Sequence, residues 1–184
     1  MGIKPVGNKS CTTRNRRIAL LAGAVLALVA LSGCTGPNGY SNETLFPEDV
    51  TSVRLEMFDN RSFRRGVEYE LSDALAKRIE AMTPYKIVSS KDRSDSVISG
   101  QLLSISESAL TIDRDTALPL EKEVVLTAVV NWKNLNTGRL MINNKTITAA
   151  ASYSEFQNQD FTYASALAAN KLAKKIVESM ENNW

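Results

Sequence analysis

DSVISGQLLSISESAL at residues 95–110 and VVLTAVVNW at residues 124–132 decide the fold, because both stretches are typical of long β-strands. The segment between them, DRDTALP at 113–119, holds aspartates and a proline that favour a turn. The pattern therefore predicts a hairpin of two long strands. Asn136-Thr137-Gly138 follows as a second turn, in which glycine accepts a positive φ. Residues 140–153 are expected to return antiparallel to the second strand.

Two amphipathic helices are predicted, one before these strands in the sequence and one after them. Apolar residues recur at helical spacing across 67–82 and again across 161–180. Pro84 ends the first helix, since proline lacks an amide donor and disfavours helix in the residue before it. Each helix thus has one apolar face to bury against a sheet.

Two shorter strands complete the set. Residues 50–58 alternate, with Val53, Leu55 and Met57 expected on the buried side, and residues 85–88 form a brief strand after Pro84. The resulting order is β-α-β-β-β-β-α. We therefore predict an α+β two-layer sandwich, with both helices on one face of a mixed four- to five-stranded sheet, as a single domain over residues 50–184.

The N-terminus has the pattern of a bacterial lipoprotein signal. A basic stretch precedes an uncharged apolar run at 18–30, which is too short for the roughly 20 residues that span a bilayer. Leu31-Ser32-Gly33-Cys34 then forms a lipobox. We expect residues 1–33 to be removed and Cys34 to carry diacylglycerol, with its new amine acylated, for example by palmitate. Residues 34–49 then form a lipidated tether to a membrane.

The composition of the processed chain excludes several function classes. Five of the 22 Lys and Arg residues, and none of the 20 acidic residues, lie in 1–33, so the processed chain carries a net charge of −3. This charge argues against nucleic-acid binding. The chain has no histidine, Cys11 leaves with the signal, and Cys34 is acylated. We therefore expect no metal site, no cofactor and no enzymatic activity.

Arginines supply the candidate ligand-binding residues. Arg61, Arg64 and Arg65 crowd the polar segment before the first helix, and guanidinium groups match phosphate and carboxylate geometry. The alternative is a solvated loop whose arginines pair with Asp59 or Glu68.

Charged residues also mark the predicted hairpin turn. Arg114 lies between Asp113 and Asp115, whose charges offset its own. The two aspartates could suggest a metal pair, but aspartate in a loop more commonly forms a turn.

These features together resemble the LptE family of lipopolysaccharide-assembly lipoproteins. The resemblance rests on the lipobox cysteine and on several motifs along the rest of the chain. These motifs are Gly39-Tyr40, Phe58-Asp59-Asn60, Arg65-Gly66-Val67-Glu68 with Leu71 and Leu75, the strand at 95–102, and the hairpin at 132–140. The resemblance implies a two-layer α/β domain anchored in the inner leaflet of the outer membrane, on its periplasmic side.

The resemblance also implies partners and a binding role. Members of the family sit inside a large β-barrel, LptD, which they help to fold and whose lumen they plug, and they bind lipopolysaccharide. A basic residue at the tip of the long hairpin is linked to that binding, and Arg114 occupies the matching place. A second basic position before the last helix has no counterpart, since 155–160 holds no Lys or Arg. The alternative function is an adaptor or activator of another envelope machine, such as a secretion channel or cell-wall synthase.

Overall fold

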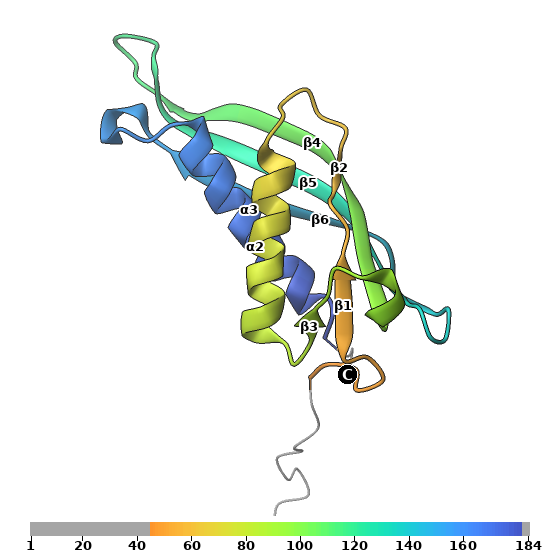
Figure 1. Ribbon diagram of the computed structural model, residues 1–184. Coiled ribbons are helices and arrows are strands. Elements are labelled where there is room, and N and C mark those ends of the chain that lie inside the picture. The colour runs from red at the N-terminus through yellow and green to blue at the C-terminus, as the bar shows by residue number, and fades with distance from the viewer. Residues whose placement is uncertain (1–44, 182–184) are drawn as a thin grey trace, which may run out of the picture. The chain divides into compact units, whose positions relative to one another are not determined.

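The structure, a computed structural model, describes residues 45–181, in which two helices lie against one face of a mixed sheet (Figure 1). The helices are α2 (Val67–Met82) and α3 (Phe161–Glu178). The strands are β1 (Ser52–Leu55), β2 (Asp59–Asn60), β3 (Lys86–Ile87), β4 (Ser96–Ile112), β5 (Pro119–Asn134) and β6 (Leu140–Tyr153). Short 3₁₀ turns occupy Lys91–Arg93 and Glu155–Gln157. The predicted signal peptide, Cys34 and the tether up to residue 44 lie outside the described residues.

The sheet has the order β3-β1-β4-β5-β6, and β2 adds a short pairing with β4. β1 runs parallel to both β3 and β4, whereas β4, β5 and β6 form an antiparallel meander. This arrangement confirms the predicted α+β sandwich and its mixed sheet. The two-residue strand β2 is an addition that the polar sequence around it did not indicate.

The core lies between the sheet and the helices. Alternate residues of β5, from Val124 to Trp132, are buried, as period-two alternation requires. The indole Nε1 of Trp132 donates to the Ser96 hydroxyl at 3.0 Å, so the large ring is buried with its polar atom satisfied. Both long strands run past the predicted ends, and the β4–β5 hairpin projects beyond the N-terminal ends of the helices (Figure 1).

Small side chains let the helices pack closely. Ala164, Ala168 and Ala173 of α3 are fully buried, and α3 contacts α2, β5 and β6. α3 begins at Asp160, whose carboxylate accepts a hydrogen bond from the Tyr163 amide at 2.8 Å. Within residues 45–181, neither helix is long and apolar enough to cross a membrane.

The first strand is shorter than predicted, and one inward residue was assigned wrongly. Met57 is 58% exposed, whereas its neighbour Phe58 is buried. The reason is that β1 ends at Leu55 and the chain turns before β2 begins. Phe58 then covers Gly100, where an added Cβ would lie 2.4 Å from the ring. The missing side chain of Gly100 therefore makes room for Phe58.

Candidate functional site

The segment between β2 and α2 is organised by one asparagine. The side-chain amide nitrogen of Asn60 donates to Glu68 Oε2 at 2.6 Å and to the Arg64 carbonyl at 2.7 Å. Its side-chain oxygen accepts from both the amide and the hydroxyl of Ser62, at 2.8 and 2.7 Å. We call residues 61–65 the arginine loop. Asn60 thus fixes the arginine loop from both ends.

Glu68 completes this scaffold as a buried carboxylate, 8% exposed. It also accepts from the Gly66 amide at 2.9 Å, where φ is +103° and favours glycine. Burial alone would raise the pKa of Glu68. Hydrogen bonds from Asn60 and the backbone, together with the charge of Arg65, outweigh burial and hold that pKa below its usual value.

The three arginines of the loop have different environments. Arg65 donates to the Asn60 carbonyl at 3.0 Å, which makes it part of the scaffold. Arg61 is exposed, with its Nε 3.6 Å from Asp59 Oδ2. Arg64 donates to Glu107 at 2.7 Å and lies 3.8 Å over the ring of Phe161. Phe63, between them, is fully exposed. The loop therefore presents Arg61, Phe63 and Arg64 to its surroundings.

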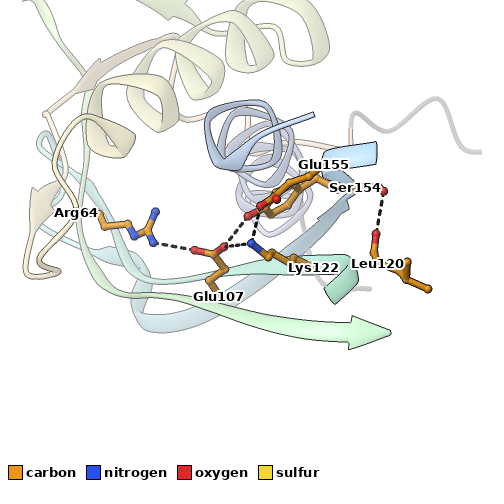
Figure 2. Close-up of polar contacts among 7 residues, drawn as sticks. Arg64, Glu107, Leu120, Lys122, Ser154 and Glu155 are labelled. Atoms are coloured by element: carbon orange, nitrogen blue, oxygen red, sulfur yellow. Dashed lines mark hydrogen bonds and ion pairs between the residues drawn. The ribbon is translucent and has the colours of Figure 1, made fainter. Parts of the chain in front are cut away.

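Arg64 is one end of a chain of charges at the root of the hairpin (Figure 2). Glu107 of β4 pairs with Arg64 and lies 4.0 Å from Lys122 of β5, which in turn donates to Glu155 at 2.6 Å. Tyr153 donates its hydroxyl to Glu107 at 2.5 Å. We call these four charged residues the root network. It ties both long strands to the arginine loop and to the turn before α3.

The root network is electrically balanced. The hydrogen bond to Glu155 raises the pKa of Lys122, which keeps the ammonium charged. Burial and the hydrogen bond to Glu107 raise the pKa of Tyr153, which keeps the phenol protonated as a donor. Two cations and two anions therefore face one another at neutral pH. An anionic ligand would have to share these cations with Glu107 and Glu155.

Arg114 lies apart from the arginine loop, at the hairpin tip. Asp113 accepts from the amides of Asp115 and Thr116 at 2.8 and 2.9 Å, and these bonds lower the pKa of Asp113. Asp113 therefore shapes a turn, which is the commoner role of aspartate in a loop. At about 3.3 Å per residue, the tip lies roughly 20 Å along the hairpin from Glu107. The structure thus brings together Arg61 and Arg64 but leaves Arg114 at a separate place.

Two neighbouring hollows open beside Arg64. One, of about 440 Å³, is lined by Arg64, Glu107 and Lys122. The other, of about 390 Å³, is lined by residues of the arginine loop together with Leu103 and Ile105. Both are lined by residues of β4 near the start of the projecting hairpin. This end of the domain is the candidate binding surface.

Several residues of this surface were missed from the sequence. Glu107, Lys122 and Tyr153 are far apart in the chain and meet only through the antiparallel register and the bulge after Leu102. Asn60 belongs to the motif Phe58-Asp59-Asn60, but nothing in the sequence indicated that it organises the arginine loop. The sequence carried one signal: Glu107 is the single charged residue of β4, and a charged residue at an inward strand position requires a partner.

Comparison with known proteins decides the family. A family model described as LptE, lipopolysaccharide-assembly, matches residues 50–183. The chain belongs to the LptE family. The match covers the domain that the structure describes, including the arginine loop and both helices, and it confirms the resemblance noted in the sequence. At family level, the protein is a lipopolysaccharide-assembly lipoprotein.

Solved structures similar to this chain include two with TM-scores of 0.50 or more, which share its fold. The hypothetical protein CT253 from Chlamydia trachomatis is 9% identical with a TM-score of 0.52, covering 70% of this chain and 94% of its own. The PelC dodecamer from Paraburkholderia phytofirmans is 12% identical with a TM-score of 0.50, covering 76% and 96%. Rare lipoprotein B from Shewanella oneidensis is 17% identical with a TM-score of 0.46, covering 71% and 93%. No curated protein matches the chain.

Proposed function

We propose that this LptE-family chain is an outer-membrane lipoprotein that serves as the assembly factor and lumen plug of a β-barrel lipopolysaccharide translocon. The family match over residues 50–183 carries the proposal. Cys34 holds the protein on the periplasmic side through its acyl chains. Thr35 follows the cysteine instead of the aspartate that commonly retains lipoproteins in the inner membrane, which favours the outer membrane.

The protein acts by binding, without catalysis. Its processed chain has no histidine and no free thiol. The domain suits a plug because its exterior is mostly polar, as contact with a wet barrel lumen requires. The projecting hairpin adds reach beyond the helices, so Arg114 at its tip can contact a ligand while the body contacts the barrel.

Lipopolysaccharide is proposed to contact Arg114 at the tip and Arg61 and Arg64 of the arginine loop. Guanidinium groups bind phosphate through paired hydrogen bonds, which suits a phosphorylated glycolipid. Arg65 supports this surface from behind, since it donates to the Asn60 carbonyl. A barrel partner and lipopolysaccharide thus use different parts of one domain.

Purification of the tagged lipoprotein from its own membranes tests the proposal with two readouts. A large β-barrel protein should co-purify, and lipopolysaccharide should be found with it. Arg114→Glu should retain the barrel and reduce bound lipopolysaccharide several-fold, because a phosphate then meets a carboxylate. Arg78→Glu, at a partly exposed position near the C-terminal end of α2, is the matched control.

Two results would contradict parts of the proposal. Recovery of a secretion-channel or cell-wall-synthase protein in place of a barrel would support the adaptor alternative. If Arg114→Glu binds as much lipopolysaccharide as wild type, the hairpin tip is not part of the binding site.

A further inference from the structure

We propose that the hollow under the arginine loop, lined by Arg61, Phe63, Arg64, Leu103 and Ile105, is a binding site for an amphiphilic anion, a phosphate group that carries an acyl chain. This inference rests on the proposed function and deepens it, since it assigns the acylated, phosphorylated part of the glycolipid to a site separate from Arg114. We call this hollow the loop pocket. Its volume of about 390 Å³ lies within the usual range of ligand sites.

The cationic side of the loop pocket is held in place before any ligand arrives. Within residues 45–181, the Arg64 side chain donates only to Glu107, through Nη2, so its other N–H groups remain for a ligand. Its guanidinium is also fixed over the Phe161 ring. Arg61 pairs only at 3.6 Å with the exposed Asp59, a contact that a phosphate can replace. Two guanidinium groups are thus available to one anion.

The apolar side comes from an irregularity of β4. The pairing of β4 with β5 shifts between Leu102 and Ser104, so Leu103 is an extra residue in the strand. Leu102 remains fully buried, whereas Leu103 is 41% exposed and lies in the loop pocket with the partly buried Ile105. Phe63 adds a fully exposed ring. An acyl chain would remove these surfaces from water.

The scaffold explains why this apolar surface stays exposed. Asn60 and Glu68 hold the arginine loop through buried hydrogen bonds, so Phe63 is kept away from the core. The Arg61 amide donates to the Leu102 carbonyl at 3.0 Å, which sets the loop directly beside the bulge. A loop fixed in this way loses little conformational entropy on binding. Purely ionic binding would need neither Leu103 nor Phe63, so their presence favours an acylated anion over free phosphate.

The first test uses photo-crosslinking of the full lipoprotein in its own membrane. A photoreactive benzoylphenylalanine replaces Leu103, and the same residue replaces Leu140 as a control, since Leu140 is a similarly exposed strand leucine at the opposite end of the domain. We expect a lipopolysaccharide adduct from position 103 and none from position 140. A protein adduct from position 103 in place of lipopolysaccharide would overturn the proposal, because a partner protein would then cover the loop pocket.

The second test separates the two halves of the ligand. Binding of the full lipoprotein in detergent-free nanodiscs is measured with intact rough lipopolysaccharide, its deacylated form and inorganic phosphate. Leu103→Asn should weaken binding of the intact form about tenfold and leave the deacylated form unchanged. Arg61→Gln should weaken both forms. Leu140→Asn and Arg78→Gln are the matched controls.

The outcomes distinguish this inference from the proposed function. Loss of binding in Arg114→Glu with no change in Leu103→Asn or Arg61→Gln would overturn the loop pocket and leave the function intact. If inorganic phosphate binds as tightly as intact lipopolysaccharide, the proposal that the loop pocket binds an acyl chain would be overturned. If wild-type protein binds phosphatidate vesicles through Leu103 but not lipopolysaccharide, the loop pocket stands and the proposed ligand fails.

Discussion

At the scale of single residues, Asp95 joins three parts of the sheet. Its Oδ2 accepts from the amides and hydroxyls of Thr51 and Ser52, at 2.6 to 3.1 Å. Its Oδ1 accepts from the Asn136 side chain at 3.2 Å. Hydrogen bonds from Thr51, Ser52 and Asn136 together hold the pKa of Asp95 far below its usual value. The carboxylate therefore fixes the start of β1 against β4 and the β5–β6 turn.

Replacing Asp95 by Asn should lower the free energy of unfolding by about 2 kcal/mol at pH 7, because a neutral amide oxygen accepts from these four donors more weakly than a carboxylate does. The folded pKa is depressed, so the stabilisation is complete above the unfolded pKa of about 4 and is lost as pH falls below it. The difference between the variant and wild type should therefore shrink at pH 3. Urea unfolding followed by circular dichroism measures both values.

Asp73→Asn is the control for this experiment, because Asp73 is exposed and pairs only with Lys77 on its own helix. It should change the free energy of unfolding by less than about 0.5 kcal/mol. Equal unfolding midpoints for Asp95→Asn and wild type at pH 7 would contradict the role given to Asp95.

The arginines show how far residue types predict a site. Their crowding before α2 was visible in the sequence and indicated an anion-binding surface. The different roles of the arginines were not visible, because Arg64 pairs with Glu107, 43 residues away in the chain, and Arg65 donates to a backbone carbonyl. The alternative pairing of Arg61 with Asp59 is present, at 3.6 Å. The role of each arginine therefore depends on which group lies beside it in the fold, and the local sequence pattern does not give this for Arg64 or Arg65.

At the scale of elements, β6 is an edge strand that α3 partly covers. The Lys171 ammonium donates to the Ala150 carbonyl at 3.0 Å, and the Lys175 ammonium donates to the Thr148 carbonyl at 2.6 Å. These carbonyls are not used in pairing β6 with β5, so they would otherwise face outward from the sheet. An exposed edge of this kind can pair with another chain. The two lysines thus protect the edge.

Replacing Lys171 and Lys175 together by Ser should let two copies pair along β6, because the freed carbonyls accept from a second strand. Sedimentation of the full lipoprotein in detergent should show concentration-dependent dimers. The free energy of unfolding should fall by less than about 1 kcal/mol per lysine, since both contacts are exposed. Lys174→Ser is the control, because Lys174 pairs with Glu178 on its own helix. A monomeric double variant would show that the lysines do not guard the edge.

Elements with a long periodic signal were predicted well from the sequence. α2 begins and ends where the stripe from Val67 and the stop at Pro84 indicated, and the turn around Gly138 has the positive φ that was expected. Short elements were not predicted well. β2 has two residues, and Met57 and Phe58 exchange places because the chain leaves β1 early. Such details depend on Gly100 and on pairing with β4, which no local pattern records.

At the scale of the whole molecule, the distribution of charge decides how the domain can be held at a membrane. The root network has equal numbers of cations and anions, and the tip places Arg114 between Asp113 and Asp115, so the tip is not basic overall. With residues 1–33 removed, as we propose, the chain would be acidic overall, and its net charge would not draw it to an anionic membrane. In the proposed function, membrane attachment therefore comes from a lipid on Cys34, since two or three acyl chains exceed the single-chain threshold for stable anchoring.

Replacing Cys34 by Ala should consequently release the protein or leave it unprocessed, because the thiol that receives diacylglycerol is gone. Fractionation should find wild type in the outer membrane, and the variant either free in the periplasm or retained with residues 1–33 attached. Mass spectrometry of the N-terminus distinguishes these two forms. Cys11→Ala is the control, since Cys11 lies in the segment that is removed, and it should remain lipidated. A Cys34→Ala protein that still fractionates as a processed, detergent-extractable lipoprotein would refute the anchor, and with it the proposed location of the domain beside its barrel.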